Sequence, residues 1–220
     1  MQVIKVAPSI LSADVGNLEK EVLSAKKAGA DWIHYDIMDG HFVPNLTFGP
    51  DIVRRLSSLS GFSDVHLMIE EPERYAKKFS DAGADNITFH YEAVKDPLET
   101  AEFTRSLKKG IKVGISLKPR TPVEKVMPLL NFFDVILVMS VEPGFSGQKF
   151  IPSSLKKIEA LRNEIDKRKL DTLIEVDGGV NDKTIEEVRK AGADVVVTGS
   201  YFFSSLNRKE AVKFLKGQEE

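Results

Sequence analysis

A histidine and an aspartate stand two residues apart in the segment His34–Gly40, which reads HYDIMDG. If this segment is a strand, alternate side chains point to the same side, so His34, Asp36 and Met38 share one face. An imidazole and a carboxylate in that arrangement can bind a metal ion, or act as a base with its partner. Alternatively, the two side chains only form hydrogen bonds in a polar loop at a strand end.

Similar residues lie at the ends of other apolar runs. His66 and Met68 repeat the His-x-Met spacing, Asp177 ends the run Ile174–Asp177, and Ser9 ends the first apolar run. Two histidines and two aspartates that meet at one point would offer the nitrogen and oxygen ligands that suit Zn²⁺, Mn²⁺, Co²⁺ or Fe²⁺. The structural alternative is that each histidine bonds a backbone carbonyl and each aspartate caps a helix.

Three methionines, Met38, Met68 and Met139, lie on these runs. Methionine ordinarily fills gaps in a hydrophobic core. Beside the polar cluster, these three would instead form an apolar floor under a reacting group.

Glycines follow three successive apolar runs, in the segment Glu142–Gln148, at Gly178 and Gly179, and at Gly199 before Ser200. Glycine lets the backbone approach an anion closely and turn its amides toward it. Barrels often bind phosphate with the loops after strands seven and eight. Ordinary turns are the alternative. The sequence contains neither a P-loop motif nor a Rossmann fingerprint, so nucleotide binding has little support.

The phrase Ala-Gly-Ala-Asp occurs three times, beginning at Ala28, Ala82 and Ala191. Each copy follows a helix-periodic segment and precedes a β-branched or aromatic run. Its glycine suits the left-handed residue just past a helix end. The three glycines lie 54 and 109 residues apart, close to two and four units of about 27 residues, and 220 residues hold eight such units.

The sequence predicts eight strands alternating with helices. The strands are expected at Val3–Ile10, Trp32–Met38, Asp64–Ile69, Asn86–His90, Lys112–Leu117, Val135–Val141, Thr172–Asp177 and Val195–Thr198. The helical stretches include Leu18–Ala28, Pro72–Ala82, Pro97–Lys109 and Lys183–Ala191. Fully apolar strands are typical of a parallel sheet covered on both faces. We therefore predict a (β/α)₈ TIM barrel, formed by residues 1–220 as one domain. A doubly wound open sheet is the alternative, because periodicity does not prove closure.

Composition excludes several function classes. The 31 basic and 33 acidic residues nearly balance, which gives no electrostatic footprint for nucleic acid or a membrane surface. The chain has no cysteine, so disulfides, thiolate metal sites and a cysteine nucleophile are excluded. The N-terminus does not resemble a signal peptide, and no apolar run is long enough to span a membrane. We expect a cytoplasmic protein.

Several long motifs together resemble those of the ribulose-phosphate 3-epimerase family. They are Ala7–Asp14, His34–Asn45, His66–Met68, Val141–Gly147 and Val176–Val180. The resemblance extends from the first strand to Ser200, which is essentially the whole chain. It implies a ribulose-phosphate-binding barrel that converts D-ribulose 5-phosphate to D-xylulose 5-phosphate in the pentose phosphate pathway.

The resemblance also implies a role for each matching residue. One divalent metal ion per subunit, most simply Zn²⁺ and otherwise Fe²⁺, Mn²⁺ or Co²⁺, would be bound by His34, Asp36, His66 and Asp177. Asp36 and Asp177 would exchange the C3 proton as two bases through a 2,3-enediolate, while Ser9 and His66 contact the substrate. The phosphate end would be held by Gly144, Phe145, Ser146, Gly147, Gly178, Gly179, Gly199 and Ser200.

Two departures from the family pattern affect loops. Ser146 replaces a glycine that is usual in the loop after strand six, and serine is less free at positive φ. Lys118-Pro119-Arg120-Thr121-Pro122 stands where Asn-Pro-x-Thr-Pro is frequent. The two cations of this segment face either the mouth of the barrel or solvent. The loop of residues 144–150 would close over a substrate.

Two other functions remain possible at this stage. One is a 3-epimerase of a hexulose 6-phosphate such as D-allulose 6-phosphate. The other is a phosphosugar-binding protein with a vestigial site. We expect a homo-oligomer, in which Phe42, Phe48 and Phe62 either form an interface or cap the barrel.

Overall fold

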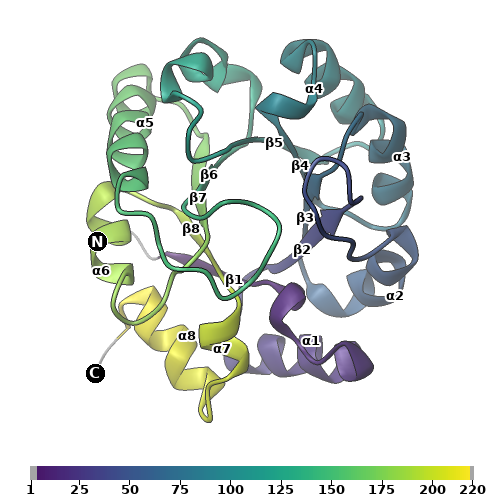
Figure 1. Ribbon diagram of the computed structural model, residues 1–220, viewed down its shortest axis with the longest axis vertical. Coiled ribbons are helices and arrows are strands. Elements are labelled where there is room, and N and C mark those ends of the chain that lie inside the picture. Colours follow the sequence, from purple (N-terminus) through teal and green to yellow (C-terminus); the bar gives the residue numbers. More distant parts are fainter. Residues whose placement is uncertain (1–3, 219–220) are drawn as a thin grey trace.

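Eight parallel strands surround a common axis in the computed structural model, which describes residues 4–218 (Figure 1). Each strand from β2 to β8 is hydrogen-bonded to the next, and β8 pairs with β1. The strands are β1 (Lys5–Pro8), β2 (Ile33–Met38), β3 (Ser63–Met68), β4 (Asn86–His90), β5 (Lys112–Leu117), β6 (Val135–Met139), β7 (Leu173–Asp177) and β8 (Val195–Thr198). All eight predicted strands are present.

The seam between β1 and β2 closes the sheet into a barrel. Ser9 and His34 form an isolated parallel bridge there, and the backbone N–H groups of Asp31 and Trp32 donate to the carbonyl of Val6. The predicted barrel is thereby confirmed, and the open sheet is excluded. Because the seam joins Ser9 to the strand that carries His34, it also brings the first strand to the polar cluster.

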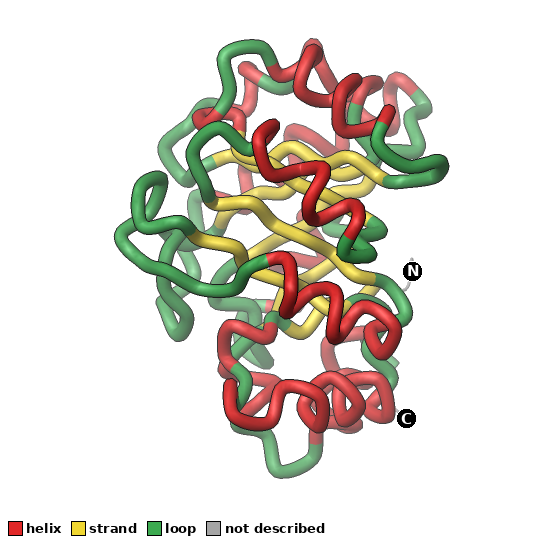
Figure 2. Tube along the Cα trace, turned by 90° about the vertical axis from the view of Figure 1, so that its right-hand side faces the viewer, coloured by secondary structure: helices red, strands yellow, loops and turns green. Residues whose placement is uncertain are grey.

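Helices cover the outside of the barrel, as Figure 2 shows around the strands. They are α1 (Leu18–Ala28), α2 (Pro50–Ser60), α3 (Glu73–Asp81), α4 (Pro97–Ser106), α5 (Ser154–Arg168), α6 (Ile185–Ala191), α7 (Ser200–Phe203) and α8 (Arg208–Lys216). Short 3₁₀ helices lie at η1 (Ile10–Ser12), η2 (Val15–Asn17), η3 (Tyr91–Ala93), η4 (Val123–Lys125) and η5 (Met127–Phe132). Among the described residues, no helix has the length and apolar character that crossing a membrane requires.

Several bounds and one connection differ from the predicted pattern. The first strand ends at Pro8, because the Ser9 side chain accepts a hydrogen bond from the N–H of Leu11 and begins η1 instead; Val3 lies outside the described residues. The sixth strand ends at Met139, two residues early. Between β5 and β6 the chain forms η4 and η5 rather than one α-helix, because Pro128 has no N–H to donate to the carbonyl of Glu124.

Apolar side chains on the outward faces of the strands form the main core against the helices. Tyr35, Leu67 and Phe89 are buried there. At the N-terminal end of the barrel, Trp32 stacks on Phe62 with 4.5 Å between ring centroids. Phe62 therefore packs within the chain, against a buried cluster that includes Ala7, Val135 and Val195. The homo-oligomeric state remains a prediction, which light scattering would test.

An aspartate before each even-numbered strand from β2 to β8 binds the beginning of the strand before it. Each carboxylate accepts from a backbone N–H, in the pairs Asp31 with Val6 (2.8 Å), Asp85 with Ser63 (2.9 Å), Asp134 with Val113 (3.0 Å) and Asp194 with Ile174 (2.8 Å). Three of the four belong to the Ala-Gly-Ala-Asp repeats, whose glycines have φ of 94°, 103° and 101° as predicted. The repeat thus ends a helix and joins two strands.

Candidate active site

Strands β2 and β3 place their polar side chains side by side on the inner face of the barrel. In their register Asp36 lies opposite His66 and Met38 lies opposite Met68. Asp177 ends β7 and lies opposite Met139 of β6. The predicted polar residues therefore converge at the C-terminal ends of the strands, where barrel active sites lie.

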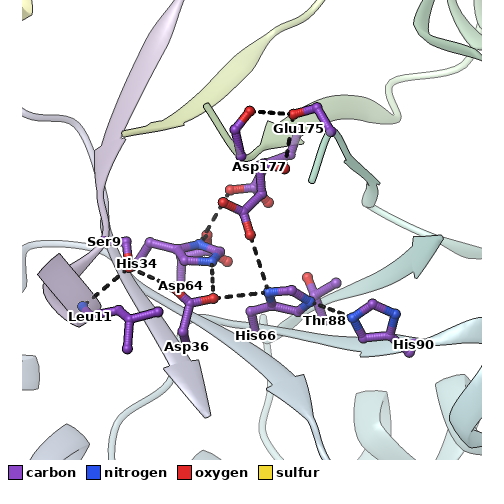
Figure 3. A network of polar contacts seen from close by, with 12 residues as sticks. Ser9, Leu11, His34, Asp36, Asp64, His66, Thr88, His90, Glu175 and Asp177 are labelled. Atoms are coloured by element: carbon purple, nitrogen blue, oxygen red, sulfur yellow. Dashed lines mark hydrogen bonds and ion pairs between the residues drawn. The ribbon is translucent and has the colours of Figure 1, made fainter. Parts of the chain in front are cut away.

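His34, Asp36, His66 and Asp177 point toward one another in Figure 3. His34 Nε2 lies 3.4 Å from Asp36 Oδ1, and His66 Nδ1 lies 3.3 Å from the same oxygen and 3.7 Å from Asp177 Oδ2. The other oxygen of Asp36 accepts a 2.5 Å hydrogen bond from Ser9 Oγ. Since Ser9 Oγ itself accepts from the N–H of Leu11, its own proton is directed to Asp36.

The four side chains fit a divalent metal ion. One ligand atom from each residue lies within 4.8 Å of the ligand atoms of the others. His34 Nε2 is buried and has no hydrogen-bond partner among the described residues, which is costly for a polar atom unless a ligand completes it. A set of two imidazole nitrogens and two carboxylate oxygens suits a borderline or hard divalent ion.

The two aspartates of the cluster have opposite pKa shifts. Burial raises the pKa of Asp177 to about 6, and repulsion from Asp36 adds to the effect. Burial also acts on Asp36, but attraction to His34 and His66 holds the pKa of Asp36 well below its usual range. One carboxyl is therefore suited to carry a proton and the other to accept one.

A cavity of about 290 Å³ opens directly above the cluster. Its walls include most of the predicted site residues, namely Ser9, Asp36, Met38, Met68, Met139, Gly144, Phe145, Ser146, Gly147, Asp177, Gly178, Gly179, Gly199 and Ser200. His34 and His66 are fully buried and do not line it. This placement favours a ligand role for both histidines, and the predicted substrate contact of His66 stays untested.

Glycine is required at the far side of the cavity. Gly178 and Gly179 have φ of 120° and 68°, and a Cβ on Gly179 would lie 2.5 Å from the backbone nitrogen of Phe150. Gly144 and Gly147 also have positive φ, whereas Ser146 does not. The serine that departs from the family pattern is therefore compatible with the loop, because the glycines beside it carry the strained conformations.

The loop after β5 separates its two cations. Lys118 Nζ lies 3.7 Å from the ring centroid of Phe42, so it covers an aromatic side chain beside the site. The Arg120 side chain is 94% exposed, with Nε 3.8 Å from Glu142. Neither cation lines the cavity.

A second polar layer beneath the cluster was not predicted. Asp64 Oδ2 lies 2.7 Å from His34 Nδ1, and Asn86 donates to the other oxygen of Asp64. Glu175 is fully buried nearby, and burial together with repulsion from Asp64 raises its pKa well above the usual range. The sequence did contain a signal, because Asp64 and Glu175 each precede a predicted ligand by two residues and so share its strand face.

Strand β4 contributes His90, its last residue. Burial lowers the pKa of His90 to about 4. The neighbouring Glu92 has a pKa lowered to about 2: burial opposes that shift, but hydrogen bonds from His90 and Thr121 outweigh it. A neutral imidazole therefore lies beside a carboxylate near the cluster.

Comparison with known proteins identifies the family of this chain. Residues 5–203 match the model of the ribulose-phosphate 3 epimerase family. A relative named ribulose-phosphate 3-epimerase from Mycobacterium bovis is 47% identical over 97% of this chain and 92% of its own length. One of the same name from Bacillus subtilis is 46% identical over 98% of this chain and 100% of its own length.

Among solved structures, orotidine 5'-phosphate decarboxylase from Pyrococcus horikoshii superposes with a TM-score of 0.66 at 16% identity, covering 97% of this chain and 98% of that chain. At that identity it supports the barrel fold alone. The family model and the full-length relatives go further, and together they establish that this chain belongs to the ribulose-phosphate 3-epimerase family.

Proposed function

We propose that the protein epimerises C3 of D-ribulose 5-phosphate to give D-xylulose 5-phosphate. Family membership and the names of the relatives support this activity. The observation that carries it is the pair Asp36 and Asp177, which come from β2 and β7 and both line the cavity beside the two buried histidines.

Inversion at a carbon beside a ketone requires removal of a proton from one face and delivery of a proton to the other. Asp36 and Asp177 perform these two steps, one as general base and the other as general acid, and they exchange roles with the direction of the reaction. The substrate passes through a planar 2,3-enediolate between the two transfers. Ser9 holds Asp36 in place through its hydrogen bond to Oδ2.

His34, Asp36, His66 and Asp177 would hold one divalent metal ion, for which we propose Zn²⁺ first and Fe²⁺, Mn²⁺ or Co²⁺ otherwise. When bound, the ion supplies a Lewis acid that stabilises negative charge on substrate oxygens by several kcal/mol. Met38, Met68 and Met139 line the same cavity and exclude water from the reacting carbon.

The phosphate group would lie against the glycine loops after β6, β7 and β8. Positive φ at Gly178 and Gly179 lets the backbone pass close to a ligand. Gly199, Ser200 and the residues 144–147 complete this side of the cavity. The distance between an anchored phosphate and the two aspartates then selects the length of the sugar.

The test replaces each aspartate by its neutral isostere. Asp36→Asn and Asp177→Asn should each lower epimerisation in both directions by on the order of 10²–10⁴-fold, because both transfers are needed for inversion. Incorporation of solvent deuterium at C3 should fall together with the rate of epimerisation. Asp51→Asn, at a side chain 93% exposed on α2, is the matched control.

Metal content is measured on every variant, because both aspartates are also candidate ligands. Turnover within tenfold of the parent for either variant would overturn the two-base mechanism. Parallel assays on D-allulose 6-phosphate decide the substrate, and a higher kcat/KM on that hexulose would reject the pentulose assignment.

A further inference from the structure

The second nitrogen of His66 contacts another histidine rather than a carboxylate. His66 Nε2 lies 2.9 Å from Nε2 of His90, and Nδ1 of His90 lies 3.2 Å from Oε2 of Glu92 (Figure 3 shows the two histidines). Both rings are fully buried and lie outside the cavity. A line of three side chains therefore runs from the cluster to η3.

With a metal ion bound to His66, this geometry determines where each proton lies. Two imidazole nitrogens at hydrogen-bond distance share one proton, so one donates and the other accepts. His66 Nδ1 faces Asp36 and Asp177 and must keep a lone pair to bind a metal ion, which leaves the proton on Nε2. His90 then accepts at Nε2, carries its own proton on Nδ1 and donates it to Glu92.

Glu92 can enforce this arrangement because its other oxygen is already held. Oε1 accepts from the backbone N–H of Lys118 at 2.9 Å and from the hydroxyl of Thr121. Lys157 Nζ in turn donates to the carbonyls of Lys118, Pro119 and Thr121, at 3.0, 2.7 and 2.6 Å. These hydrogen bonds hold the loop after β5 against α5. The loop in turn holds Oε1 of Glu92, the oxygen that does not face His90.

His34 has the opposite arrangement. Its Nδ1 meets Asp64 directly, and its Nε2 faces the cluster. His66 presents Nδ1 to the cluster, so its supporting carboxylate lies one imidazole further away. The two histidines therefore depend on different carboxylates at different distances.

We propose that His90 and Glu92 are positioning residues that fix the tautomer of His66, so that its Nδ1 lone pair is available to a metal ion. The proposal rests on the proposed function, since it concerns a ligand of the metal ion assigned there. The loop Lys118–Pro122, which departs from the family pattern, gains a role as the anchor of Glu92.

Glu92→Gln is the decisive variant. A glutamine offers one acceptor, and the N–H of Lys118 requires it, so the amide NH₂ faces His90 Nδ1. His90 must then accept at Nδ1 and donate from Nε2, which forces the proton of His66 onto Nδ1. This single isosteric change should therefore reverse the tautomers of His90 and His66 and leave Nδ1 of His66 without a lone pair for a metal ion.

Long-range ¹⁵N–¹H spectra of the metal-free protein measure the tautomers directly. In the parent we expect a proton on Nε2 of His66 and a proton on Nδ1 of His90; in Glu92→Gln we expect Nε2 of His66 to lack its proton and His90 to carry its proton on Nε2. Zn²⁺ affinity, measured by competition with a chromophoric chelator, should fall about 10–100-fold in that variant. Glu102→Gln, at an exposed position on α4, is the matched control, because it makes the same chemical change away from the cluster.

Glu92→Ala separates positioning from packing. Alanine removes the acceptor for His90 Nδ1 but does not place an N–H donor there, as glutamine does. Both tautomers of His90 and His66 should then be populated, and Zn²⁺ affinity should fall less than in Glu92→Gln. A purely structural role predicts the reverse ranking, with the truncation worse than the isostere. Thermal unfolding identifies any variant that does not fold.

Unchanged tautomers with Zn²⁺ affinity within twofold of the parent in Glu92→Gln would overturn the proposal. So would the reverse ranking of the two variants. A parent protein that binds no divalent ion would instead reject the metal assignment in the proposed function, while the spectra of the metal-free protein still decide the tautomers.

Discussion

Nδ1 of His34 lies 2.7 Å from Oδ2 of Asp64, and neither side chain is exposed to solvent. The contact orients the ring so that Nε2 faces the cluster. Supporting carboxylates of this kind fix ring orientation and raise the basicity of a metal-binding histidine. Asp64 therefore supports the candidate ligand His34 although it does not line the cavity.

Asp64→Asn should lower Zn²⁺ affinity about 10–100-fold. The reason is that Asn86 already donates to Oδ1 of Asp64, so an asparagine there turns its amide NH₂ toward either Asn86 or His34. Equilibrium dialysis with metal analysis measures the effect, with Asp51→Asn as the surface control. An affinity equal to that of the control would contradict the role assigned to Asp64.

Stability of the metal-free protein should respond to pH through Asp177. Its folded pKa is about 6 and its ordinary value is 3.8, so between these values the folded state binds more protons than the unfolded state. The contribution of Asp177 is therefore fully favourable below about pH 4 and is lost as pH rises through 6.

Above about pH 6 the folded parent must keep the buried Asp177 carboxylate ionised, which lowers its stability. Asp177→Asn removes this cost, so the melting temperature of the variant relative to the parent should increase between pH 4 and pH 6 and then level off. The full difference in the free energy of unfolding is on the order of 3 kcal/mol. Differential scanning calorimetry in the presence of a chelator measures it. A difference that does not vary with pH would show that Asp177 titrates normally.

Gly179→Ala should weaken binding of the phosphate group. An added Cβ would lie 2.5 Å from Phe150 N and 2.8 Å from its Cα, both of which are backbone atoms, and φ is 68°. We expect KM to rise at least tenfold while kcat changes less, because the aspartates are untouched. Steady-state kinetics and inorganic phosphate competition measure this.

Gly110→Ala is the control for that variant, since Gly110 has φ of 82° and open space around the Cβ position. It carries the same kind of backbone strain away from the cavity. Equal changes in KM for the two variants would mean that strain, rather than loop position, controls phosphate binding.

Asp194→Ala should destabilise the fold more than Asp85→Ala. Both carboxylates accept from the first N–H groups of a strand, but Asp194 is 3% exposed and Asp85 is 37% exposed. Loss of a buried acceptor leaves Ile174 N unsatisfied, so we expect about 3 kcal/mol for Asp194 and about 1 kcal/mol for Asp85. Urea unfolding measures both, and equal losses would refute the dependence on burial.

Much of the fold followed from local pattern. The glycine of each Ala-Gly-Ala-Asp repeat adopts the left-handed conformation wherever the repeat occurs, because a helix end needs that conformation regardless of context. Strand ends were less predictable. Ser9 ended β1 early by capping η1, and the proline at 128 prevented one continuous helix between β5 and β6.

The candidate site was predictable where polar residues interrupt apolar strands. Asp36 and His66 stand out for that reason, and the structure places them opposite each other. Glu92 could not be found in the same way, since it lies beyond the end of β4 in η3 and an acidic residue there resembles any solvated one. Its partner Thr121 is 29 residues away.

The sequence by itself determined the alternation of strands and helices, the face of each strand that carries polar side chains, and the family. These depend on residue type and periodicity, which are local. Only the tertiary structure decided that the seam from Ser9 to His34 closes the barrel, that both histidines lie beneath the cavity, and that His66 reaches Glu92 through His90. Such contacts depend on the shear and packing of strands that lie far apart in the chain, so no local pattern contains them.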